Sequence, residues 1–137
     1  MAVLSSRPAP NRCSPKPSLE ARPLLTGAEA VSLQRLFKLL ASGSRLRLLH
    51  ALARAGEVCV SDLARETGMT QQAVSNQLRR LSDTGIVASR RQGLRVYYAI
   101  ADSCVVQLIG LGLCLMEDSR QRAERPALPV PRAGAER

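Results

Sequence analysis

The fold is decided by residues 61–100, which read SDLARETGMT QQAVSNQLRR LSDTGIVASR RQGLRVYYAI. The first half of this segment predicts two helices joined by a tight turn. Ser61 caps a short helix that ends at Gly68, and Thr70 caps a second helix that extends to about Thr84. A short helix, a turn containing glycine and a second helix with one polar face are typical of a helix-turn-helix.

The second half of the segment predicts a β-hairpin over residues 86–100. Residues rich in β-branched and aromatic side chains flank a turn at residues 91–94, and Gly93 lies in that turn. A helix-turn-helix followed by a hairpin predicts a winged helix-turn-helix. The expected fold class is therefore mainly α with a β-hairpin wing.

Helical patterns continue on both sides of this segment. Apolar residues recur at helical spacing over 31–40 and 46–53, and we expect Gly43 to end the first helix and Ser44 to cap the second. A last helix, capped by Asp102 or Ser103, is expected to run to about residue 122. Its apolar stretch over 105–116 must be covered, so we expect dimerisation through the terminal helices.

Length and composition set the domain organisation. The chain has 137 residues, which is enough for one core, and 45% of them are hydrophobic while only 2% are aromatic. Residues 1–27 are rich in proline and locally basic, which predicts a disordered arm. We expect residues 28–122 to form the DNA-binding and dimerisation domain and residues 123–137 to form a flexible tail.

Charge points to a polyanionic partner. The formal net charge is +9 and the pI is about 10.7. Residues 71–98 contain five arginines but only one acidic residue, and Gln, Asn and Arg can read base edges in the major groove of duplex DNA. The candidate DNA-binding residues are Gln71, Gln72, Ser75, Asn76, Gln77, Arg79 and Arg80 on the second helix, with Arg90, Arg91 and Arg95 on the wing.

Several classes of protein are disfavoured. No apolar run is long enough to span a membrane, and the N-terminus has no hydrophobic core of a secretory signal, so we expect a cytoplasmic protein. An enzyme is not expected, because the chain has one histidine, no nucleophile–base motif and no phosphate-binding glycine loop. A winged helix used only for protein contacts is the alternative from another class, and the basic wing argues against it.

The four cysteines are Cys13, Cys59, Cys104 and Cys114, and none forms a CxxC pair. In a reducing compartment they are expected to be thiols, ligands or redox sensors rather than structural disulfides. Ten residues along one straight helix correspond to ~15 Å, whereas sulfurs that share an ion lie within ~5 Å of each other. Cys104 and Cys114 can therefore share an ion only across two copies of the chain.

Four stretches together resemble the ArsR/SmtB family of metal-sensing winged-helix repressors, over about residues 29–118. They are LFKLLASGSRLRLL (36–49), EVCVSDL (57–63), QAVSNQLRRL (72–81) and GIVASRRQGLRVYY (85–98). The resemblance implies a homodimer that binds double-stranded operator DNA with inverted repeats and is released by an effector. One departure is Gln77, where many members carry histidine.

The resemblance also implies two possible sensor sites. One lies across paired final helices, where Asp102, Cys104 and Asp118 match family ligands but Leu115 replaces the third. The other combines a cysteine box with the N-terminal arm. Cys59 and Cys13 match it, while Ser61 replaces its second cysteine.

From these matches we expect a thiolate-rich site formed by Cys59, Cys104 and Cys114 across the dimer. Thiolate ligands favour soft ions such as Hg(II), Cd(II), Pb(II) or As(III). A redox or persulfide sensor of the same fold is the alternative, since two adjacent thiols can form a disulfide or polysulfide without metal.

Overall fold

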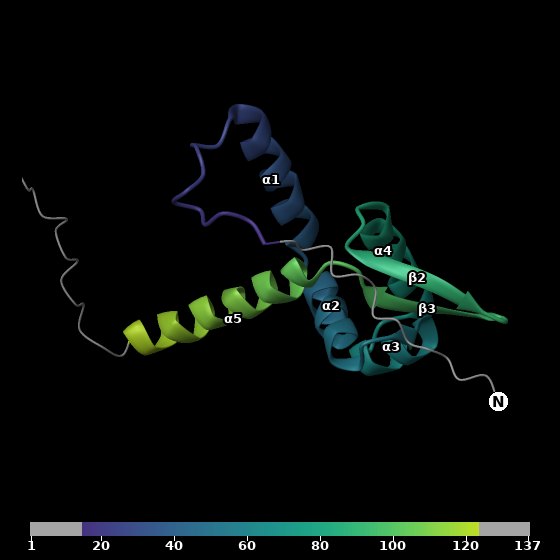
Figure 1. Cartoon of the computed structure of the whole chain (residues 1–137). Coiled ribbons are helices and arrows are strands. Elements are labelled where there is room, and N and C mark those ends of the chain that lie inside the picture. The colour runs from purple at the N-terminus through teal and green to yellow at the C-terminus, as the bar shows by residue number, and fades with distance from the viewer. Residues whose placement is uncertain (1–14, 124–137) are drawn as a thin grey trace, which may run out of the picture.

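The computed structural model describes residues 15–123, so about half of the predicted arm and nearly all of the predicted tail lie outside the described residues. Residues 15–26 contain no helix or strand. The elements that follow are α1 (Gly27–Leu40), α2 (Gly43–Ala55), β1 (Val58–Cys59), α3 (Val60–Thr67), α4 (Gln71–Asp83), β2 (Val87–Gln92), β3 (Arg95–Ile100) and α5 (Ser103–Ala123) (Figure 1). This order confirms the predicted winged helix-turn-helix.

The start of α2 differs from the prediction. Its N-cap is Ser42 and not Ser44, because Ser42 has the extended backbone of an N-cap (φ −144°, ψ 120°) and its hydroxyl accepts from the Arg45 N–H. Ser44 already lies inside the helix. At the other end of the chain the side chain of Asp102 accepts from the Cys104 N–H at 2.9 Å, as expected for the cap of α5.

The helix-turn-helix consists of α3 and α4. Gly68 ends α3 in the left-handed conformation (φ +71°), which glycine adopts without strain. Thr70 caps α4 as predicted, since its hydroxyl accepts from the Ala73 N–H at 3.1 Å. The cap of α3 is Cys59 rather than Ser61. Pairing of Cys59 with Tyr97 keeps Cys59 extended (φ −86°, ψ 164°), so the helix begins at the next residue.

The wing belongs to a three-stranded antiparallel sheet with the order β1-β3-β2. β2 and β3 form the predicted hairpin, with Gln92 opposite Arg95 and a tip of Gly93 and Leu94. Gly93 has φ +60°, the left-handed conformation that favours glycine in a tight hairpin turn. The short β1 pairs with β3, so the wing is joined by backbone hydrogen bonds to the residues that start α3.

The core joins the helix-turn-helix to α2. Its fully buried side chains are Leu48, Leu49, Leu52, Leu63, Val74, Leu78 and Leu81. They come from α2, α3 and α4, so these three helices share one apolar centre. Burial of the inner face of α4 turns its polar face outward.

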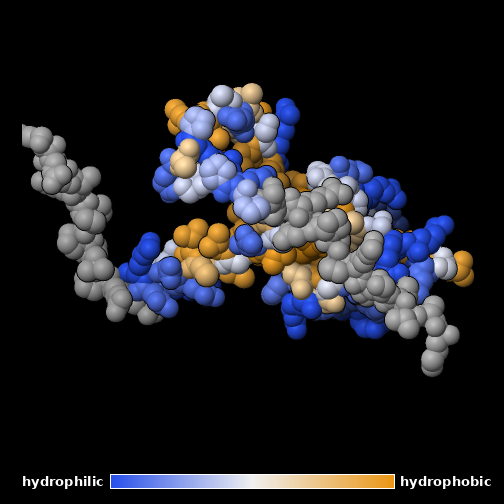
Figure 2. Space-filling model, viewed as in Figure 1, coloured by the Kyte–Doolittle hydropathy of each residue, from blue (hydrophilic) through white to orange (hydrophobic). Residues whose placement is uncertain are grey.

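The two terminal helices leave large apolar side chains exposed. On α1 these include Val31, Leu33 and Phe37, and α5 exposes Leu111 and Leu115 to about two thirds. Both helices project from the body formed by the other elements, and apolar surface follows α5 over much of its length (Figures 1 and 2). Among the described residues no helix meets the length and hydropathy needed to cross a membrane.

Candidate nucleic-acid interface and thiol site

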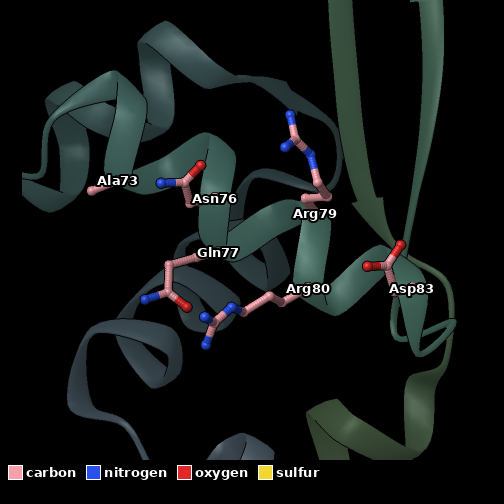
Figure 3. Close-up of a pocket in the computed structure, with 6 residues that line it drawn as sticks. All are labelled: Ala73, Asn76, Gln77, Arg79, Arg80 and Asp83. Atoms are coloured by element: carbon pink, nitrogen blue, oxygen red, sulfur yellow. The ribbon is translucent and has the colours of Figure 1, made fainter.

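The outer face of α4 gathers polar and basic side chains. Val74, Leu78 and Leu81 point into the core, so the predicted contact residues occupy the other side of the helix. Gln71, Gln72, Asn76, Arg79 and Arg80 are exposed, and Ser75 and Gln77 are half-buried. An open hollow along this face is lined by Ala73, Asn76, Gln77, Arg79, Arg80 and Asp83 (Figure 3).

The side-chain amides on this face differ in the hydrogen bonds that they already make within the protein. Gln72 donates from Nε2 to Oδ1 of Asn76 at 3.3 Å, so these two residues, one helical turn apart, form a pair on the exposed surface. Gln77 accepts at Oε1 from Nε of Arg45 in α2 at 2.6 Å. Sequence reasoning did not identify Arg45, because the two residues are 32 positions apart and no local pattern connects them.

The wing arginines divide into one paired residue and two free ones. Arg90 donates from Nε to the carboxylate of Glu57 and from Nη1 to Oε1 of Gln92, and its guanidinium lies 5.0 Å from the ring centre of Tyr97. The hydrogen bond to Glu57 raises the pKa of Arg90. Of the candidates on the wing, Arg90 therefore also braces the sheet.

Arg91 and Arg95 are exposed, and within residues 15–123 neither takes part in an ion pair. Both flank the hairpin tip, on β2 and β3 respectively. Their charges are thus available to an external anion such as phosphate.

Cys59 occupies the junction between the wing and the helix-turn-helix. Its side chain is buried, with 4% exposed, and its sulfur lies 3.2 Å from the hydroxyl of Ser61 and donates to Oδ2 of Asp62 at 3.2 Å. The contact with Asp62 was not expected from the sequence. The one sign of this contact in the sequence is that Asp62 follows Cys59 by three residues at the start of a helix, where side chains and free backbone N–H groups converge.

The other two candidate ligands lie on α5. Cys104 is half-buried in the first turn and is disulfide-bonded, whereas Cys114 is an exposed free thiol further along the helix. In the described part of one chain no three His, Cys, Asp or Glu side chains form a cluster suited to a metal ion. One chain thus does not bring the three predicted cysteines together, and Cys13 lies outside the described residues.

The central part of the chain matches the family model described as bacterial regulatory protein, arsR family, over residues 42–89. A transcriptional repressor SmtB homolog from Synechocystis is 46% identical over 58% of this chain, which spans 60% of that protein. A cadmium resistance regulatory protein CadC from Listeria innocua is 32% identical over 72% of this chain and 82% of its own length.

Solved structures that resemble this chain also belong to a transcriptional repressor and to a DNA-binding domain. The crystal structure of the AntR antimony-specific transcriptional repressor is 55% identical, covers 80% of this chain and 98% of its own, and has a TM-score of 0.68. The solution structure of a homodimeric winged helix-turn-helix DNA-binding domain from Mycobacterium bovis is 35% identical, with a TM-score of 0.58. It covers 71% of this chain and 92% of its own.

Proposed function

Since the chain belongs to the ArsR family of bacterial regulatory proteins and is a metal-responsive transcriptional repressor, we propose how it binds and is released. It binds double-stranded operator DNA as a homodimer, and a soft thiophilic ion releases it by binding at a cysteine site. The observation that carries this proposal is the position of Cys59. It pairs with Tyr97 of the wing and directly precedes the helix-turn-helix.

The DNA contact assigns separate roles to α4 and to the wing. The amides and arginines of α4 lie on one exposed face, where they can enter the major groove and reach base edges. The wing presents Arg91 and Arg95 beside its tip, where they can reach phosphates or the minor groove. The net charge of +9 favours the same partner.

The homodimer follows from the uncovered terminal helices. α1 contributes to the core only through its last turn, with Leu36, Leu39 and Leu40. Its remaining apolar residues and the exposed apolar residues of α5, such as Leu111 and Leu115, are left to a second copy. The homodimeric state of the related domain from Mycobacterium bovis supports this assembly.

The sensor site requires two copies of the chain. Cys59, Cys104 and Cys114 do not form a cluster in the described part of one chain, so the site draws ligands from both protomers. Cys59 would hold the ion as a thiolate, so its thiol proton would be released to solvent and its hydrogen bond to Asp62 would be lost, at the junction of β1 and α3. Release from the operator requires that the ion bind the DNA-free dimer more tightly than the operator-bound dimer.

The choice of ion follows from sulfur chemistry. Three thiolates without histidine favour Hg(II), Cd(II), Pb(II) or As(III) over zinc. The antimony-specific repressor supports a trivalent ion of the arsenic group, and the CadC relative supports cadmium. Cys104 can ligate only as a thiolate, so the disulfide seen there must be reduced before metal binds.

Single serine variants test the sensor. In reduced protein, we expect metal to weaken operator binding of the parent chain at least about tenfold, which corresponds to ~1.4 kcal/mol of coupling. Cys59→Ser and Cys104→Ser should each reduce this response to less than about twofold, while metal-free affinity is retained. Fluorescence anisotropy of labelled operator, titrated with As(III), Sb(III), Cd(II), Hg(II) or Pb(II), measures the release. Full metal-induced release by both variants would refute the site.

Thiol oxidation is a second candidate trigger, and the disulfide of Cys104 favours it. Peroxide or a persulfide donor would then release the operator in the presence of a chelator, and mass spectrometry would find the cysteines oxidised. Release by metal under reducing conditions, with metal bound stoichiometrically, identifies the metal as the effector instead.

A matched pair of wing variants tests the DNA contact. Each phosphate contact contributes about 0.9 to the slope of log K against log salt concentration. Arg91→Ala should lower the slope of the dimer by about 2, since the free arginine is lost from both protomers. Arg90→Ala should lower it by less, because Glu57 already neutralises much of that charge. Equal changes in the two slopes would contradict this division of the wing.

A further inference from the structure

Arg45 lies at an unusual position for a basic side chain. It is the third residue of α2, where the positive end of the helix dipole disfavours a cation. Its side chain is nevertheless half-buried rather than directed into solvent. Two hydrogen-bond partners outside α2 account for this placement.

Those partners join three helices. Nε of Arg45 donates to Oε1 of Gln77 on α4 at 2.6 Å, and Nη1 donates to the backbone carbonyl of Leu39 at the end of α1. The last carbonyls of a helix have no partner within it, so Arg45 supplies one that α1 lacks. A single guanidinium thus connects the end of α1 to the polar face of α4.

The contact fixes which way the Gln77 amide points. A guanidinium has only donors, so the atom of Gln77 that faces it must be the carbonyl oxygen. The NH₂ group is then left for an external partner. Figure 3 shows Gln77 beside Asn76 and Arg80 on α4, among the candidate DNA contacts.

We propose that Arg45 is a positioning residue that makes Gln77 a hydrogen-bond donor toward the operator. This inference rests on the DNA-binding function proposed above. Glutamine reads adenine with two bonds, in which its carbonyl accepts from N6 and its NH₂ donates to N7. Here the carbonyl is already held by a cation, so Gln77 selects an acceptor, namely a phosphate oxygen, a purine N7, guanine O6 or thymine O4.

Lysine at position 45 is the informative substitution. It keeps the positive charge, but one ammonium on a flexible stem lacks the fork of guanidinium donors that reaches Gln77 and Leu39 together. Arg45→Lys should therefore release the Gln77 amide without changing the net charge. Gln77→Ala removes the amide itself.

The test is a double-mutant cycle on the full-length dimer, with a duplex taken from the protein's own promoter as the probe. We expect Arg45→Lys and Gln77→Ala each to weaken binding about fivefold to tenfold. The double variant should bind the operator no more weakly than Gln77→Ala, because both substitutions remove the same hydrogen bond between Gln77 and the operator. The salt slope of Arg45→Lys should equal that of the parent chain. Additive losses, or an Arg45→Lys variant with parental affinity, would overturn the proposal.

Modified bases test the donor role without altering the protein. Replacing each operator adenine by purine removes N6 and should leave the Gln77→Ala effect unchanged. Each possible acceptor can be removed in turn, with a 7-deaza purine for N7, 2-aminopurine in place of guanine for O6, 5-methyl-2-pyrimidinone in place of thymine for O4, or a methylphosphonate for a phosphate oxygen. Removing the correct acceptor should abolish the Gln77→Ala effect, and the modification that does so identifies the acceptor. Loss of the effect with purine would show adenine readout and refute the proposal, even if Arg45→Lys failed to fold. If the parent chain did not bind the unmodified operator at all, the proposed DNA-binding function would be refuted instead.

Discussion

A variant carrying Leu111→Glu and Leu115→Glu is expected to be monomeric and to bind its operator at least about 100-fold more weakly than the parent chain. These two leucines are one helical turn apart on α5 and are 64% and 65% exposed. In a dimer they would lie in the apolar contact, where four unpaired carboxylates are strongly unfavourable. The operator loss follows because two linked half-site readers bind by avidity, which contributes about 10²–10⁴.

Sedimentation velocity gives the oligomeric state, and anisotropy gives the affinity. The matched control is Ser119→Glu with Gln121→Glu, which adds the same charge to exposed positions of α5 beyond its apolar stretch. The control should remain dimeric with affinity within about twofold of the parent. A dimeric double-leucine variant would show that α5 is not the dimer contact.

The second large effect concerns the inner face of the DNA-reading helix. Leu78→Ala is expected to lower the free energy of unfolding by about 2–5 kcal/mol, the usual range for a leucine truncated in a packed core. Leu78 has no exposed surface and belongs to the core shared with α2 and α3. Loss of this anchor loosens the support of the outer face of α4.

Urea unfolding, followed by circular dichroism at one fixed protein concentration, measures the change. Gln71→Ala is the control on the same helix, since Gln71 is exposed and its replacement should change the free energy by less than about 0.5 kcal/mol. A Leu78→Ala variant that loses less than about 1 kcal/mol would mean that α4 is not anchored by this side chain.

Local patterns in the sequence were sufficient for most of the fold. Thr70 as the cap of α4, Gly68 as the end of α3 and Gly93 in the hairpin tip were all predicted correctly. Each of these signals acts within a few residues, through a hydroxyl that caps a helix or a glycine that permits positive φ. The exposed polar face of α4 followed from its helical period.

The error at α3 occurred where a distant partner changes a local preference, whereas the error at α2 concerns two serines that are two residues apart. Ser61 is a good N-cap in isolation, but pairing of β1 with β3 keeps Cys59 extended and moves the start of α3. The place of β1 in the sheet was not predicted from the sequence. Pairing across about forty residues depends on the packed structure, and the local pattern does not contain it.

The sequence alone thus determined the winged helix-turn-helix and the residues that face outward on α4. Only the tertiary structure decided how these side chains are engaged. Arg90 pairs with Glu57, and Arg45 holds Gln77, across 33 and 32 positions of sequence. Periodicity and caps are local properties of a chain. The partner of a long polar side chain depends on which elements meet in space, so the division between free and braced arginines appears only in the folded molecule.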